Sequence, residues 1–61
     1  MDMSEIYRRN AVNERALAAA CQLPNRRTLY EKSAETWEAM AAAAEQTKDM
    51  AVANAAAKAA A

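Results

Sequence analysis

The carboxylates are the first residues that suggest chemistry, because four of them recur at helical spacing: Glu31, Glu35, Glu38 and Glu45. Such rows begin the di-metal sites of four-helix bundles, but those sites also require an inward-facing histidine, and the sequence contains none. Ser4 and Ser33 lack a histidine base for nucleophilic catalysis, and a chain without glycine has no glycine-rich loop to cradle a phosphate. We therefore expect no enzymatic activity, no cofactor and no metal site, and we interpret the glutamates as a solvent-facing surface.

Two adjacent arginines, Arg26 and Arg27, follow the only proline and would stand in the first turn of a helix, where cations oppose the helix dipole. Two interpretations are open. In one, Arg27 pairs with Glu31 four residues later and Arg26 points to water. In the other, both guanidinium groups join the free N–H donors of the helix end and bind a phosphate or carboxylate.

The charges are distributed unevenly along the chain. Five arginines precede residue 28, at positions 8, 9, 15, 26 and 27, whereas most acidic residues lie between 31 and 49. This asymmetry suggests complementary electrostatics between molecules. The formal net charge is zero, so no long-range field favours nucleic acid or an anionic membrane as a partner.

Large apolar side chains recur at helical spacing in the second half of the chain, at Tyr30, Trp37, Met40 and Met50. Such a stripe is more typical of a core or an interface than of a ligand site. Two helices enclose Trp37 on one side only, so covering it requires further helices. Small alanines on the same helix allow close approach, and we predict an interface formed by Tyr30, Trp37, Met40, Ala44 and Ala51.

The elements that must position these residues are helices, because the 61-residue chain is rich in alanine and lacks glycine. We predict a first helix over about residues 4–22, with Asp2 or alternatively Ser4 as its N-cap. Pro24 ends it, since the residue before a proline, Leu23, is pushed toward extended backbone. A second helix over about 26–55 begins with Asn25 as its N-cap or with Pro24 as its first residue.

The predicted fold is therefore all-α: one domain over residues 1–61, an antiparallel helical hairpin with a turn at 23–25. An alanine-rich tail, residues 56–61, either extends the second helix or frays. So short a chain has a marginal core, so we expect two hairpins to pair as a homodimer in a four-helix bundle.

Counting outward from the turn predicts which residues face one another: Leu17 near Leu29 and Tyr30, Asn10 near Trp37, and Met3 near Ala44. Asn10 then interrupts an apolar stripe. Its side chain either accepts a hydrogen bond from the indole N–H of Trp37 and fixes the register, or lies at the edge and meets water.

The location expected from the sequence is the cytoplasm. Its apolar runs are shorter than the roughly 20 residues that a membrane span requires, and the opening MDMSEIYRR has no hydrophobic signal segment. The single cysteine, Cys21, has no partner for an internal disulfide and is interpreted as a packing residue.

The stretch from Leu23 to Gln46 resembles a group of short bacterial helical proteins that have no established activity. The resemblance rests on the LPN turn and on a SAxxWxxMAxxAE-like pattern from Ser33 to Glu45. It implies a helical hairpin and adds no function.

Two function hypotheses follow from these patterns. The first is a non-enzymatic protein–protein interaction module, a small regulator, adaptor or accessory subunit that binds itself or a larger protein through the aromatic and alanine face. The alternative is a small nucleic-acid-associated regulatory protein that uses the arginine-rich first helix and the hairpin tip. Neither hypothesis involves a small-molecule substrate or a membrane.

Overall fold

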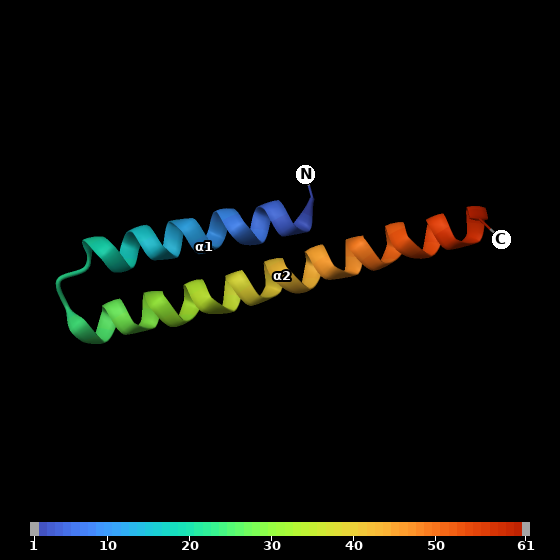
Figure 1. Cartoon of the computed structure of the whole chain (residues 1–61). Coiled ribbons are helices and arrows are strands. Elements are labelled where there is room, and N and C mark those ends of the chain that lie inside the picture. Colours follow the sequence, from blue (N-terminus) through green and yellow to red (C-terminus); the bar gives the residue numbers. More distant parts are fainter. Residues whose placement is uncertain (1, 61) are drawn as a thin grey trace.

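The computed structural model describes residues 2–60, which form two helices and no strand. Helix α1 (Met3–Ala20) and helix α2 (Pro24–Ala60) run antiparallel and are joined by the short segment 21–23 (Figure 1). The helices pack against each other. The all-α hairpin predicted from the sequence is therefore confirmed.

Helix α1 begins at a cap that the sequence predicts. Asp2 has extended backbone, and its carboxylate accepts hydrogen bonds from the backbone N–H of Ser4 at 3.4 Å and from the Ser4 hydroxyl at 3.1 Å. The carbonyl of Asp2 accepts from the backbone N–H groups of Glu5 and Ile6. Because the first backbone donors of a helix lack intrahelical partners, these contacts fix where α1 starts.

The turn comes slightly earlier than expected. Helix α1 ends at Ala20, and the next residue, Cys21, is extended, with φ −83° and ψ 126°. Helix α2 starts at Pro24, whose missing N–H costs nothing at the first helical position, and the carbonyl of Leu23 accepts from the backbone N–H of Arg27 at 2.9 Å. Of the two starts considered for the second helix, the one at Pro24 is correct.

Helix α2 continues past the predicted end near residue 55 and reaches Ala60. No proline or glycine interrupts the alanine-rich sequence, so the helical hydrogen-bond ladder extends through the tail. Of the predicted tail, only residue 61 lies outside the described residues.

The two helices meet along small side chains that repeat every seven residues. Ser4, Ala11 and Ala18 are buried on α1, and Ala34 and Ala41 are 0% exposed on α2. A seven-residue repeat keeps one stripe of each helix facing its partner, as in a coiled coil, and small side chains let the backbones approach closely. No large side chain is fully buried within residues 2–60.

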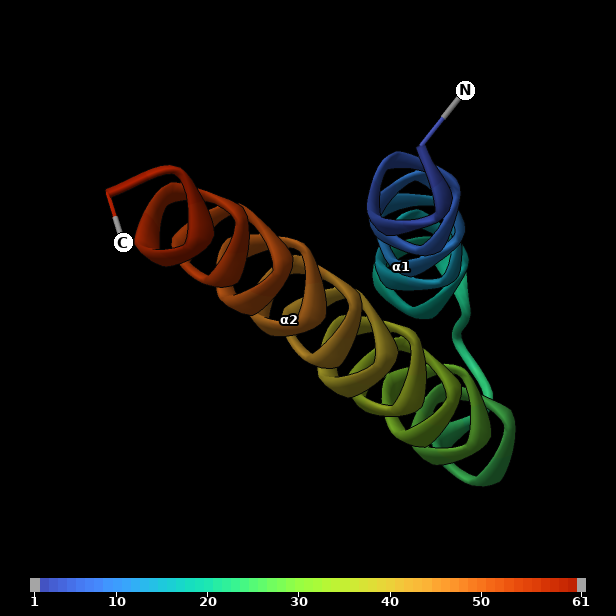
Figure 2. The ribbon, with the colours of Figure 1, turned by 90° about the vertical axis from the view of Figure 1, so that its right-hand side faces the viewer.

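The molecule is one helix layer thick. Its principal extents, measured on Cα atoms, are 57 × 18 × 10 Å, and Figure 2 shows α1 nearly end-on and α2 obliquely, with no third element of residues 2–60 covering the pair. The last turns of α2 project beyond the start of α1, and residues 46–60 are exposed (Figure 1). Neither helix within the described residues is long and apolar enough to cross a membrane.

Candidate interaction surface

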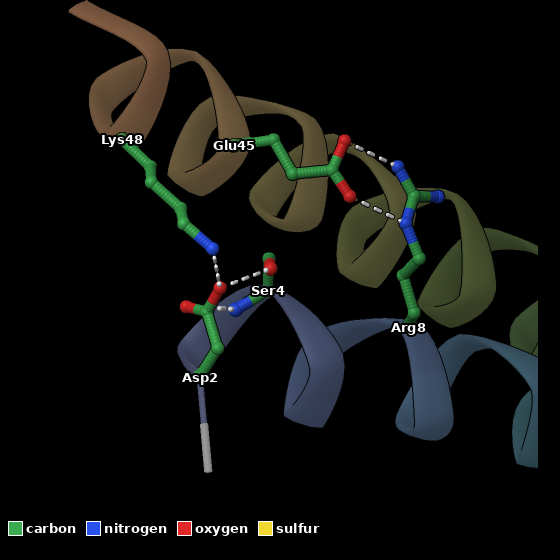
Figure 3. Close-up of polar contacts among 5 residues, drawn as sticks. All are labelled: Asp2, Ser4, Arg8, Glu45 and Lys48. Atoms are coloured by element: carbon green, nitrogen blue, oxygen red, sulfur yellow. Dashed lines mark hydrogen bonds and ion pairs between the residues drawn. The ribbon is translucent and has the colours of Figure 1, made fainter. Parts of the chain in front are cut away.

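One side of the helix pair is closed by ion pairs. The Arg8 guanidinium donates to both carboxylate oxygens of Glu45 at 2.7 and 2.8 Å, and Arg15 donates to both oxygens of Glu38 at 3.2 and 2.8 Å. Figure 3 shows the Arg8 and Glu45 side chains reaching across from one helix to the other. We call these four residues the charged edge.

The charged edge also changes the acidity of its carboxyl groups. The hydrogen bonds from Arg15 hold the pKa of Glu38 below its ordinary value, and those from Arg8 do the same for Glu45. Near the start of α1, a hydrogen bond from the Lys48 ammonium at 3.2 Å, with further bonds from Ser4, lowers the pKa of Asp2 (Figure 3). Each shift favours the charged carboxylate.

These contacts add to one expectation and correct another. The glutamates were expected to form a solvent-facing surface, and the side chains of Glu38 and Glu45 are 44% and 43% exposed, but both are also bound to arginines of α1. The opposite charges of the two halves were expected to act between molecules, whereas Arg8 and Arg15 use them within one hairpin. Side chains lean toward the N-terminus of their own helix, so those of two antiparallel helices lean in opposite directions. Long charged side chains on the two helices can therefore lean toward each other and meet across the pair.

The opposite side of the helix pair is aromatic. The rings of Tyr7 and Trp37 stack with centroids 5.8 Å apart and planes 29° from parallel. Residues that continue the helical spacing from these two rings share their side of the pair. We call this set the aromatic face, and it comprises Met3, Tyr7, Asn10, Glu14, Leu17 and Cys21 on the α1 side, and Arg26, Tyr30, Ser33, Trp37, Met40 and Ala44 on α2.

Much of the apolar surface on the aromatic face is accessible to solvent. Met3 is 50% exposed, Leu17 48% and Met40 38%. Tyr30, Trp37 and Ala44 are half-buried, and Ala51 lies on the exposed projecting part of α2. Four of the five predicted interface residues, Tyr30, Trp37, Met40 and Ala44, thus lie on the aromatic face together with residues of α1. The fifth, Ala51, lies outside this face.

Tyr7 is the aromatic residue of this face that the predicted interface omitted. Its signal in the sequence is its position on the apolar stripe of the first helix, but Asn10 was placed opposite Trp37 instead. In the structure, Trp37 stacks on Tyr7, one turn before Asn10. Asn10 is half-buried, and within residues 2–60 no side-chain hydrogen bond joins it to Trp37.

At the hairpin tip, Arg27 binds the end of the other helix. Its guanidinium donates two hydrogen bonds, at 3.2 and 2.7 Å, to the carbonyl of Cys21, the C-cap residue that follows α1. The predicted pair between Arg27 and Glu31 is therefore wrong. Arg26 is exposed and forms no ion pair with any other residue of the described chain, so only Arg27 is held by a contact within the hairpin.

Two open hollows lie on the charged side. One, of about 320 Å³, is lined by Arg15, Ala18, Ala19, Arg27 and Glu31. The other, of about 370 Å³, is lined by Asp2, Ser4, Glu5, Glu45, Lys48 and Asp49. Both mix acidic and basic side chains, several of which are already paired, so neither offers a ligand a set of groups of one sign.

Comparison with protein-family models, with curated proteins and with solved structures gave no match. The resemblance carried by the LPN turn and the Ser33–Glu45 pattern therefore rests on those residues alone. One side of the hairpin is closed by its own ion pairs, and the other presents aromatic and apolar side chains to solvent.

Proposed function

We propose that this protein is a non-enzymatic protein–protein interaction module, a small regulator, adaptor or accessory subunit that acts through the aromatic face. The observation that supports this proposal most directly is the stacked pair of Tyr7 and Trp37, which shares its face with the exposed side chains of Leu17 and Met40. Aromatic and methionine side chains that pack against their own protein on one side and are exposed to solvent on the other are typical anchors of protein interfaces.

The first partner we propose is a second copy, with two hairpins forming a four-helix bundle through this face. A hairpin one layer thick cannot enclose Trp37 by itself, and among residues 2–60 the buried seam contains only serine and alanine side chains. A standard interface buries about 800 Å² on each partner. That area is about a sixth of the 4736 Å² that one hairpin exposes, which one face of the hairpin can supply.

The experiment that tests this proposal compares Trp37→Ala with Val12→Ala. Val12 is 67% exposed on the charged side of α1, so its loss removes apolar surface without touching the aromatic face. We expect the parent and Val12→Ala to be dimers, with melting temperatures that rise over a hundredfold concentration range. Loss of a central aromatic anchor costs at least about 2 kcal/mol of binding, so Trp37→Ala should dimerise about thirtyfold more weakly.

Light scattering and circular dichroism provide the measurements, and the latter checks that each variant is still helical. A parent that stays monomeric, with a melting temperature independent of concentration, would remove the homodimer. Equal dimer affinities for Trp37→Ala and Val12→Ala would remove the aromatic face as the contact.

The nucleic-acid alternative has less support from the geometry. Of the five arginines that it would use, Arg8 and Arg15 are bound to glutamates and Arg27 to a backbone carbonyl. Contacts to phosphate make affinity fall steeply with salt, whereas an apolar interface is nearly insensitive to it. Oligonucleotide binding that weakens strongly between low and moderate salt would favour this alternative over the proposed module.

A further inference from the structure

The aromatic face carries only two charged side chains, and they have opposite signs. Glu14 lies on α1 seven residues from both Tyr7 and Cys21, and Arg26 lies four residues before Tyr30 on α2. We propose that these two residues recognise each other between copies of this protein, with Glu14 of each hairpin paired to Arg26 of its partner. This inference rests on the proposed homodimer and specifies what makes the contact selective.

The state of Glu14 supports such a role. Its side chain is half-buried on the aromatic face, and it has no ion-pair partner within residues 2–60. By contrast, Glu38 and Glu45, on the charged edge, are each bound by an arginine of α1. A carboxylate that an interface covers must gain a cation, because burying it alone is costly.

Arg26 is the cation that the same face provides. It is exposed and unpaired within the described residues, whereas the neighbouring Arg27 is held by the Cys21 carbonyl. The other arginines of α1 that lie near the seam, Arg8 and Arg15, belong to the charged edge on the opposite side. A partner that presents this same face therefore brings one guanidinium and one carboxylate to the contact.

A two-fold contact uses such a pair without any further residue. In an isologous interface, if residue i touches residue j of the partner, residue j also touches residue i of the partner. One carboxylate and one guanidinium per copy then form two identical ion pairs. The zero net charge of the chain adds no long-range repulsion between copies.

Charge reversal tests the pairing. Glu14→Arg and Arg26→Glu should each weaken the homodimer at least about tenfold, because each places two pairs of like charges in the contact. The double variant Glu14→Arg with Arg26→Glu should dimerise like the parent. Arg9→Glu and Glu35→Arg, two exposed positions without an ion pair in the described structure, serve as controls and should leave the dissociation constant unchanged.

Mixing the two single variants separates recognition between molecules from a pair formed within one. If Glu14 meets Arg26 of its partner, an equimolar mixture of Glu14→Arg and Arg26→Glu should form a heterodimer with both ion pairs restored. A pair within one hairpin would be broken in both variants, and the mixture would stay as weak as its components. Fluorescence anisotropy with one labelled variant measures the heterodimer directly.

The outcomes separate this inference from the proposed function. A parent that dimerises through Trp37 but shows no greater response to reversal at Glu14 or Arg26 than at the control positions would overturn the charge pairing alone. A parent that remains monomeric would overturn the homodimer and the pairing together. Tight heterodimers from two weak single variants would support both.

Discussion

At the scale of single residues, Arg27 explains how a cation can stand in the first turn of α2. A positive charge there opposes the dipole of its own helix. The side chain, however, reaches back to the carbonyl of Cys21, which lies at the C-terminal end of α1, where a cation is favourable. Helix α1 has no basic residue in its own last turn, so Arg27 supplies the missing charge from the neighbouring helix.

Arg27→Ala should therefore destabilise the hairpin. We expect the melting temperature to fall by a few degrees, because a charge-assisted contact to an otherwise open carbonyl is lost in a very small domain. Thermal melts monitored by circular dichroism measure this change. Arg27→Lys keeps the charge without the two-pronged geometry and should give an intermediate value.

Lys32→Ala removes an exposed cation from the same helix and is the matched control. Equal melting temperatures for Arg27→Ala and Lys32→Ala would show that the contact to Cys21 contributes nothing to stability.

At the scale of the two helices, packing and charge have different roles. The seam of Ser4, Ala11 and Ala18 against Ala34 and Ala41 sets a close approach but buries little area. The charged edge then acts along one flank, with arginines seven residues apart on α1 facing glutamates seven residues apart on α2. It favours the antiparallel alignment in which both pairs form together.

The charged edge predicts how stability depends on pH. Its arginines lower the pKa of Glu38 and Glu45 below the ordinary value of 4.5, so the folded state favours the ionised carboxylates. The resulting stabilisation is fully present at neutral pH and is lost as the pH falls below 4.5 and through the lowered values. The double variant Arg8→Gln with Arg15→Gln should melt at a lower temperature than the parent at pH 7 and at nearly the same temperature at pH 2.

Because the variant and the parent are compared at the same pH, the effect of the other carboxyl groups on the melting temperature cancels in the difference. Arg9→Gln controls for the loss of an exposed arginine. Because these pairs are on the surface, added salt should reduce the difference at pH 7. A difference that persists unchanged at pH 2 would mean that the arginines stabilise the hairpin through packing of their side chains.

The sequence predicts the helices better than the way they meet. The cap at Asp2 and the start of α2 at Pro24 follow from local chemistry and are visible in the sequence alone. The ion pairs were missed because helical periodicity treats each helix separately and does not state which flank faces the partner. The signal that could have indicated the facing flanks is a shared seven-residue spacing. The arginines at 8 and 15 have this spacing, as do the glutamates at 38 and 45 and the small residues of the seam.

At the scale of the whole molecule, the two arms of the hairpin are unequal. Helix α2 has 37 residues and α1 has 18, so the two helices cover each other only as far as the Lys48 contact with Asp2. Beyond that contact every described residue is exposed, including Met50 at 59% and Val52 at 63%. The projecting part, residues 49–60, has only its own backbone ladder to hold it in shape.

Removing most of this projection should leave the hairpin intact. A chain ending at Asp49 keeps the seam, the charged edge, the aromatic face and the Lys48 contact with Asp2, so we expect an unchanged melting temperature. In the full chain, helical ends without tertiary contacts open readily, so amides of residues 50–60 should exchange with solvent much faster than those near Ala34 and Ala41. Calorimetry of the shortened chain and hydrogen exchange of the full one make the two measurements. A shortened chain that melts as low as Trp37→Ala, or slow exchange across residues 50–60, would instead mean that the projection packs against a second molecule.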